Sequence, residues 1–181
     1  MLLGGIPPGA DNLVQALATP AFWLVGIVMS LVLGPLSEEF GWRGFALDPL
    51  QARWSALVAS LVLGVFWLLW HAPEFFMVGI PTGEIVSGIV PFLTFAADVI
   101  AMAVLYTWVF NNTNRSILSA ILLHFSHNFI LNMLVPLSER ADLFQSIILV
   151  LISVVVISVW GPKSLARKPD TAKQESGRVG L

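Results

Sequence analysis

Long apolar runs, separated by short polar or proline- and glycine-rich stretches, divide the chain into segments of similar length. Most of these runs approach the roughly 20 residues that a helix needs to cross a bilayer. We expect membrane spans at 20–36, 55–71, 89–110, 116–136 and 143–160. The first run is short for a span, so we expect its helix to continue through the acidic stretch that follows it.

Polar residues, prolines and glycines mark the connections between these spans. Residues 44–54 place Asp48, Gln51 and Arg53 on an apolar background, which predicts a short amphipathic helix at the membrane surface. Pro73 is expected to end the second span, because proline lacks the N–H that a regular helix needs. We expect a loop at 74–88 and a tight polar turn at 111–115. The predicted fold class is therefore all-α: a polytopic membrane helix bundle of about five transmembrane helices plus a short amphipathic helix.

The composition supports a membrane location and removes several other classes. The chain is 57% hydrophobic and 11% charged, with a mean hydropathy of +0.85, which is typical of an integral membrane protein. It has no cysteine, so a disulfide framework and a thiolate metal cluster are excluded. The net charge is −2 and the basic residues form no patch among the apolar segments, so we expect no nucleic-acid partner.

Changes in composition predict three parts of the chain: an N-terminal loop and helical approach at 1–19, a membrane domain at 20–161, and a disordered basic tail at 162–181. If the chain has five spans and a cytoplasmic tail, Arg140 is the only one of the nine basic residues on the outer side of the membrane. Membrane proteins generally carry an excess of Lys and Arg on the cytoplasmic side, which favours this orientation. This orientation puts the amino terminus outside. We therefore expect the chain to be the carboxy-terminal part of a longer multi-span protein, or Met1 not to be the natural start.

The sequence EEFGWRG at 38–44 stands at the end of the first apolar run. Charged groups cost several kcal/mol each against hydrocarbon, so they normally line a wet cavity or a functional site. On a helix, Glu39 and Arg43 are four residues apart and can pair, which leaves Glu38 on an adjacent face to meet another partner.

Other polar residues interrupt later spans. His71 ends the second, and the fourth contains His124, with His127 and Asn128 on neighbouring positions of the same helix face. Taken singly, these residues also suit solvated helix ends, an aromatic belt or interhelical hydrogen bonds. Asp98 in the third span favours structural pairing or a wet crevice over catalysis. The occurrence of a Glu, a His and a His/Asn pair on three separate spans favours a shared site.

These residues resemble the motifs of the CPBP family of intramembrane proteases, which contains CAAX prenyl endopeptidases of the Rce1 type and bacteriocin-processing and Abi-type proteins. The family motif EExxxR matches Glu38 through Arg43, and HxxxN/D matches His124 through Asn128. The FxxxH motif matches at His71, with Trp67 in place of Phe, a departure that we take to affect an aromatic packing position. The similarity covers about 20–136.

The resemblance implies an intramembrane endopeptidase. In that interpretation Glu38 and His71 together activate a water. His124 and Asn128 hold the oxyanion, and Glu39 and Arg43 orient the helix and tune the charge of the site. The preferred mechanism needs no cofactor. A zinc ion held by Glu38, His71 and His124 is the competing mechanism, although the His-Glu-x-x-His helix typical of many zinc proteases is absent. His127 stays open as a further ligand or a supporting group.

The expected partners are the lipid bilayer and a membrane-associated peptide or protein substrate, processed in a CAAX-type or a bacteriocin- or leader-type reaction. The expected location is a bacterial cell membrane, with a cytoplasmic carboxy terminus and the active site near the cytoplasmic side. Two other classes stay open. A catalytically silent membrane scaffold or immunity protein needs no intact Glu38, and a proton-coupled small transporter would depend on Asp98 as much as on Glu38.

Overall fold

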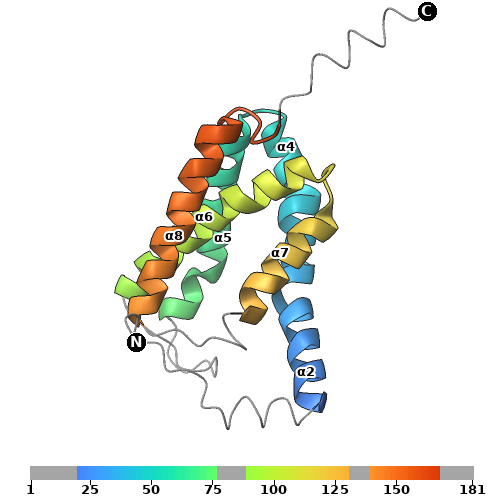
Figure 1. The fold of residues 1–181 in the computed structure, drawn as a ribbon, viewed down its shortest axis with the longest axis vertical. Coiled ribbons are helices and arrows are strands. Elements are labelled where there is room, and N and C mark those ends of the chain that lie inside the picture. Colours follow the sequence, from blue (N-terminus) through green and yellow to red (C-terminus); the bar gives the residue numbers. More distant parts are fainter. Residues whose placement is uncertain (1–19, 77–88, 131–138, 168–181) are drawn as a thin grey trace, which may run out of the picture.

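A computed structural model describes residues 20–76, 89–130 and 139–167, and every element in these ranges is helical. The elements are α2 (Pro20–Leu31), η1 (Val32–Leu36), α3 (Ser37–Glu39), η2 (Phe40–Ala46), α4 (Leu47–Gln51), α5 (Ala56–Phe76), α6 (Ile89–Asn112), α7 (Ile117–Phe129) and α8 (Glu139–Trp160). Successive helical passes run in alternating directions (Figure 1). The all-α helix bundle predicted from the sequence is confirmed.

Within the described ranges, four helices are long and apolar enough to cross a membrane: Trp23–Gln51, Ala56–Phe75, Ile89–Asn112 and Asp142–Trp160. The first is a single long helix that continues through the acidic stretch, as predicted. The fourth predicted span, 116–136, contains the shorter apolar helix α7, and residues 131–138 lie outside the described part. The amphipathic connector contains the short helix α4.

The first helix changes its winding twice near the acidic residues. The π-helical segment η1 contains Pro35, and η2 follows α3. Proline lacks the N–H of a regular turn and its ring clashes with the carbonyl four residues earlier, so a locally wider turn accommodates it. The two π-helical segments flank Glu38 and Glu39 on both sides, and such segments are frequent at functional sites.

The prediction that Pro73 ends the second span is wrong, because α5 continues through Pro73 to Phe76. Proline is tolerated inside membrane helices where neighbouring groups compensate for the lost backbone hydrogen bond. Residues 77–88 of the predicted loop lie outside the described part. The predicted turn at 111–115 begins at Thr113, with Asn114 (φ 55°) and Arg115 (φ 59°) in the left-handed region, and Ser116 caps α7.

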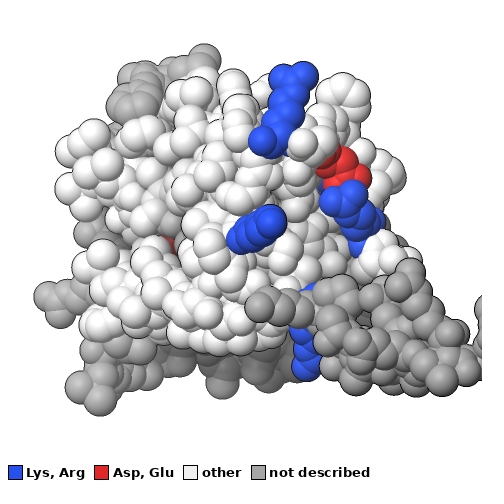
Figure 2. All heavy atoms as spheres, turned by 90° about the horizontal axis from the view of Figure 1, so that it is seen from above, with Lys and Arg blue, Asp and Glu red and all other residues white. Residues whose placement is uncertain are grey.

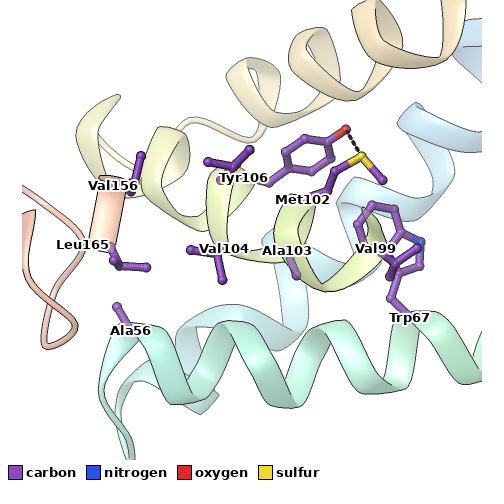
Figure 3. Packing of buried hydrophobic residues seen from close by; sticks show 10 residues of the cluster. Ala56, Trp67, Val99, Met102, Ala103, Val104, Tyr106, Val156 and Leu165 are labelled. Atoms are coloured by element: carbon purple, nitrogen blue, oxygen red, sulfur yellow. Dashed lines mark hydrogen bonds between the residues drawn. The ribbon is translucent and has the colours of Figure 1, made fainter. Parts of the chain in front are cut away.

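Helix α6 is the buried centre of the bundle and packs against α5, α7 and α8. Most of its buried apolar residues form one core with Trp67 and Ala56 of α5 (Figure 3), while Phe110 belongs to a second cluster. Gly64 lets α5 and α6 approach closely, since a Cβ there would lie 3.0 Å from the Ala103 Cβ and the Ile100 Cδ1. Many large apolar side chains on the outer helices are exposed instead, among them Leu33 and Val159, as expected of a surface that faces lipid.

Residues 161–167, which follow α8, pack against the same end of the bundle as the α4–α5 and α6–α7 connections. The Ala56 N–H donates to the Lys163 carbonyl (2.9 Å), the Asn112 side chain donates to the Leu165 carbonyl (2.8 Å), and Leu165 is fully buried. The predicted tail 162–181 therefore begins with a packed segment, while 168–181 lie outside the described part.

This end of the bundle carries most of the described basic residues. Arg53, Arg115, Lys163 and Arg167 belong to or adjoin the three connections that meet there. Figure 2 shows Lys and Arg side chains on this end, seen from above. The clustering agrees with the charge distribution used to orient the chain, and the side of the membrane that this end faces stays a prediction.

Candidate active site

Glu38 of α3 meets α5 through two side chains. The Trp67 indole N–H donates to Glu38 Oε2 (2.6 Å), and His71 Nε2 lies 3.7 Å from the same oxygen. Glu38 is 15% exposed and His71 20% exposed, so both are largely withdrawn from solvent without being sealed off. The structure therefore brings together the first two predicted catalytic residues and leaves them accessible to a small molecule such as water.

Glu39, one residue further along, belongs to a separate and fully buried cluster. Its Oε1 accepts hydrogen bonds from Arg43 Nη1 (2.9 Å) and His124 Nδ1 (2.9 Å). The predicted Glu39–Arg43 pair is thus confirmed, and both side chains have 0% exposure. A carboxylate can only accept, so this contact places the His124 proton on Nδ1 and leaves Nε2 as the nitrogen for a second partner.

The Arg43 guanidinium is also held between two aromatic rings. Its Cζ lies 5.1 Å from the Trp67 ring centroid and 4.9 Å from that of Tyr106. Cation–π contacts of this kind partly replace the solvation that a buried cation loses. His124 packs on the same two rings, at centroid distances of 5.3 Å and 5.5 Å. Arg43 and the aromatic pair therefore fix the position of Glu39 and His124 together.

Asn128 approaches Glu38 across Gly34. A Cβ at Gly34 would lie 3.4 Å from Glu38 Oε1 and 3.5 Å from Asn128 Nδ2. The amide and the carboxylate therefore face the same small space beside η1, and glycine keeps that space open. The four predicted catalytic residues, Glu38, His71, His124 and Asn128, thus gather around Trp67 and Gly34.

Sequence reasoning missed two contacts within this group. Trp67 was expected to serve as a packing residue, yet its indole N–H is the donor that a phenyl ring lacks, and it binds Glu38. Glu74 was placed in a loop, but because α5 continues through Pro73 it lies three residues beyond His71 and contacts its Nδ1 (3.0 Å). The Phe-to-Trp departure was the available signal for the first contact. A Glu at the i+3 position was the signal for the second.

Two other singled-out residues take no part in these contacts. No hydrogen bond or ion pair links His127 to the four predicted catalytic residues within the described ranges. Asp98 lies on α6 and accepts a hydrogen bond from the Gln145 side chain of α8 (3.3 Å). Its surroundings match the pairing or wet crevice expected from the sequence.

The zinc alternative finds little geometric support. In the part of the chain that the structure describes, no three His, Asp or Glu side chains are grouped as metal ligands. Of the hypothetical set, His124 turns Nδ1 to Glu39, while His71 faces Glu38 through Nε2 and contacts Glu74 through Nδ1. These residues do not fit a zinc site as they stand, and the dependence on metal stays untested.

An apolar groove of about 400 Å³ leads to Glu38. Its lining residues are Ser37, Glu38, Gly41, Trp42, Phe45, Ala46 and Trp70. Phe45 and Trp70 are strongly exposed, at 80% and 67%, so the groove opens on the apolar surface of the bundle. An apolar molecule could therefore reach Glu38 from the side that faces lipid.

Comparison with known proteins agrees with this geometry. The family model of type II CAAX prenyl endopeptidases, Rce1-like, matches residues 20–130, a range that includes Glu38, His71, His124 and Asn128. The chain is 33% identical over 135 residues to CAAX prenyl protease 2 of Methanococcus maripaludis. This match covers 74% of the chain and 49% of the relative, so the chain spans about half the length of that protein. The chain is a membrane protein and belongs to the Rce1-like family of CAAX prenyl endopeptidases.

Proposed function

We propose that the protein is an intramembrane endopeptidase that hydrolyses a peptide bond near the carboxy terminus of a prenylated, membrane-associated substrate. The family match supports the activity, and the name of the Methanococcus relative supports the substrate class. The observation that carries the proposal is the position of Glu38, which lies beside His71 at the end of an apolar groove. We favour CAAX-type over leader-type processing because both comparisons name the former.

Glu38 and His71 activate the water in this mechanism. Their facing atoms are 3.7 Å apart, a separation at which one water can contact both. Glu38 accepts the proton as the water oxygen bonds to the carbonyl carbon, and the proton then passes to the amine as the carbon–nitrogen bond breaks. The Trp67 N–H holds Glu38 Oε2 in place, so the carboxylate does not need to reorient during the reaction.

His124 and Asn128 stabilise the negative charge on the carbonyl oxygen. The Asn128 amide lies beside the Glu38 carboxylate, and His124 is fixed by Glu39 through Nδ1. Because Nδ1 donates to Glu39, His124 can donate to the oxyanion from Nε2 only when the ring carries both protons, and the Glu39 carboxylate favours that cation. Two preoriented donors lower the energy of the tetrahedral intermediate most effectively in a site with little water. Glu39 and Arg43 therefore act as positioning residues for His124 and make no contact with the substrate.

The groove accounts for an apolar substrate. Its exposed rings, Phe45 and Trp70, lie on the surface facing lipid, where a prenyl chain attached to the substrate already resides. A prenyl group that enters the groove from the bilayer brings the adjoining peptide toward Glu38. The groove therefore contributes binding, and the polar residues contribute the chemistry.

The test uses the full chain in lipid nanodiscs with a prenylated reporter peptide that ends in a CAAX sequence. Glu38→Gln keeps the size and hydrogen-bonding capacity of the side chain and removes the base, so kcat should fall about 10²- to 10⁴-fold. Asp48→Asn is the matched control, since Asp48 is half-exposed, pairs with Arg115 and is not among the residues that line the groove. Undiminished cleavage by Glu38→Gln, or by a Glu38→Gln/His124→Ala double variant, would contradict the assignment.

The same experiment separates the other classes. A silent scaffold would cleave nothing in its wild-type form. A proton-coupled transporter would show uptake into liposomes that responds to Asp98→Asn as strongly as to Glu38→Gln. Leader-type processing would appear as cleavage of an unprenylated membrane peptide in preference to the prenylated one.

A further inference from the structure

A second pocket, of about 340 Å³, lies among α5, α6 and α8 and takes no part in the mechanism above. Its lining residues are Phe75, Val90, Pro91, Thr94, Phe95, Asp98 and Asp142. The volume is at the lower end of the range seen for small-ligand sites, roughly 300–1,000 Å³. It suffices for one long side chain or a small organic ion.

Asp98 enters this pocket with an incomplete set of partners. The residue is only 8% exposed, and Gln145 donates to its Oδ2 (3.3 Å). Its Oδ1 is buried and has no hydrogen-bond partner among the described residues. The Ser146 hydroxyl, which donates to the Asp142 carbonyl (3.0 Å), also lies within hydrogen-bonding reach of the Asp98 carboxyl group, so the donors around Asp98 are neutral and none of them carries a positive charge. A buried carboxylate in this state is costly, and a cationic donor would satisfy it.

The protein's own cations do not fill this role in the described part of the chain. Arg43 is held by Glu39, and Arg115 pairs with Asp48 at the opposite end of the bundle. No ion pair joins Asp98 to any basic side chain that the structure describes. The missing positive charge has to come from outside these residues.

The walls of the pocket favour an organic cation over a metal ion. Phe75 and Phe95 line it with their ring centroids 5.0 Å apart, and Asp142 adds a second carboxyl group. Aromatic faces attract ammonium and guanidinium groups, whereas magnesium and calcium require a fuller set of oxygen ligands. Within the described residues, no three acidic or histidine side chains form such a set.

One ring connects the pocket to the candidate active site. Phe95 lines the pocket and also packs edge-on against the His71 ring, at a centroid distance of 5.3 Å. A group bound beside Asp98 would therefore lie one aromatic ring away from the side chain that faces Glu38. This separation is short enough for one extended peptide to reach both places.

We propose that this pocket binds a positively charged side chain, lysine or arginine, of the substrate peptide, with Asp98 as its counter-ion. The proposal rests on the proposed endopeptidase function, since it assigns a charge preference to that same substrate. Asp98 is a specificity residue here and takes no part in bond cleavage. Its substitution should therefore affect binding of charged substrates and leave the chemical step unchanged.

The test compares prenylated reporter peptides that carry lysine or the neutral norleucine at one position at a time. At the position that reaches Asp98, the wild-type protein should have a KM for the lysine peptide about tenfold or more below its KM for the norleucine peptide, since a hydrogen bond to a charged group is involved. Asp98→Asn should remove this preference and leave kcat for the norleucine peptide unchanged. Phe75→Leu should weaken the preference, and the Asp48→Asn control should keep it.

A wild-type protein without a lysine preference at any position would overturn the proposal. So would an Asp98→Asn variant that loses activity equally on both peptides, because Asp98 would then have a structural role. The norleucine peptide also reports folding, since a misfolded variant would not cleave it. Failure of the wild type to cleave either peptide would instead count against the endopeptidase function.

A binding measurement tests the pocket separately from the endopeptidase activity. Hexylammonium should raise the melting temperature of the wild-type protein in nanodiscs, with hexanol as the neutral control, and Asp98→Asn should abolish the difference. Equal effects of both probes would overturn the pocket's preference for cations. If phosphatidylethanolamine in the nanodisc gives the Asp98-dependent shift and peptide lysine gives no KM effect, the occupant is a lipid headgroup and the substrate assignment is wrong.

Discussion

Two adjacent glutamates on one short helix, Glu38 and Glu39, have opposite surroundings. Glu39 is fully buried, pairs with Arg43 and binds His124, so its charge is compensated on the spot. Glu38 is partly exposed, faces His71 at 3.7 Å and borders an apolar groove. The difference separates two tasks: one carboxylate holds other side chains in position, and the other is free to exchange a proton with a small molecule.

The largest effect that we expect from this difference is on the stability of the protein. Arg43→Met should reduce the free energy of unfolding by about 3–5 kcal/mol, because it leaves the Glu39 carboxylate buried beside apolar rings without its cation. Glu38→Gln, the matched change on the neighbouring acid, should alter stability by less than about 1 kcal/mol. Unfolding of both variants in mixed micelles would measure the contrast. Equal losses from the two variants would mean that the acids share one structural role.

An Arg43→Met/Glu39→Gln double variant serves as the control for this prediction. It removes both charges and should recover part of the stability lost in Arg43→Met alone, because an uncharged buried pair is less costly than a lone carboxylate. Since Glu39 also orients His124, the double variant should remain poor in catalysis even where it folds.

The parts of this arrangement that sequence could predict are those set by spacing along one helix. The Glu39–Arg43 pair follows from a separation of four residues, and the common face of His124 and Asn128 follows in the same way. The contact between His124 and Glu39 joins residues 85 positions apart, so no local pattern could reveal it. Motif resemblance indicated that these residues share a site, and the structure supplied which atom meets which.

The next prediction concerns Trp67, which contacts both Glu38 and the buried cluster that contains Glu39. Trp67→Phe keeps an aromatic ring on His124 and Arg43 but removes the N–H that holds Glu38. We expect kcat to fall about 10- to 100-fold, since a hydrogen bond to a charged group contributes roughly 1.5–3 kcal/mol. Steady-state kinetics on the reporter peptide would measure the loss.

Trp108→Phe is the control for that variant. Trp108 packs against Trp160 at a centroid distance of 5.1 Å, and its indole N–H has no partner among the described residues. Its replacement should therefore leave kcat within a factor of about two. A similar decrease in both variants would show that aromatic bulk, and not the bond to Glu38, is what matters.

Two glycines offer a smaller and more selective contrast. At Gly34 a Cβ meets Glu38 Oε1 and Asn128 Nδ2 at ordinary contact distances of 3.4 and 3.5 Å, so Gly34→Ala should fold normally but lower kcat several-fold by filling the space between them. At Gly64 a Cβ would come within 3.0 Å of Ala103 and Ile100, so Gly64→Ala should lose about 1–3 kcal/mol of stability. Measurements on both variants should show a loss of kcat with little change in melting temperature for Gly34→Ala, and mainly a lower melting temperature for Gly64→Ala.

The smallest predicted effect concerns metal. His124 Nδ1 is bound to Glu39, and Glu38 and His71 face each other without His124 as a third member of a ligand group. We therefore expect Glu38 to act as a base with His71 and without a metal ion, and 1,10-phenanthroline should leave kcat within about twofold of its untreated value. A loss of activity that added zinc restores would show instead that His124 turns away from Glu39 to bind a metal.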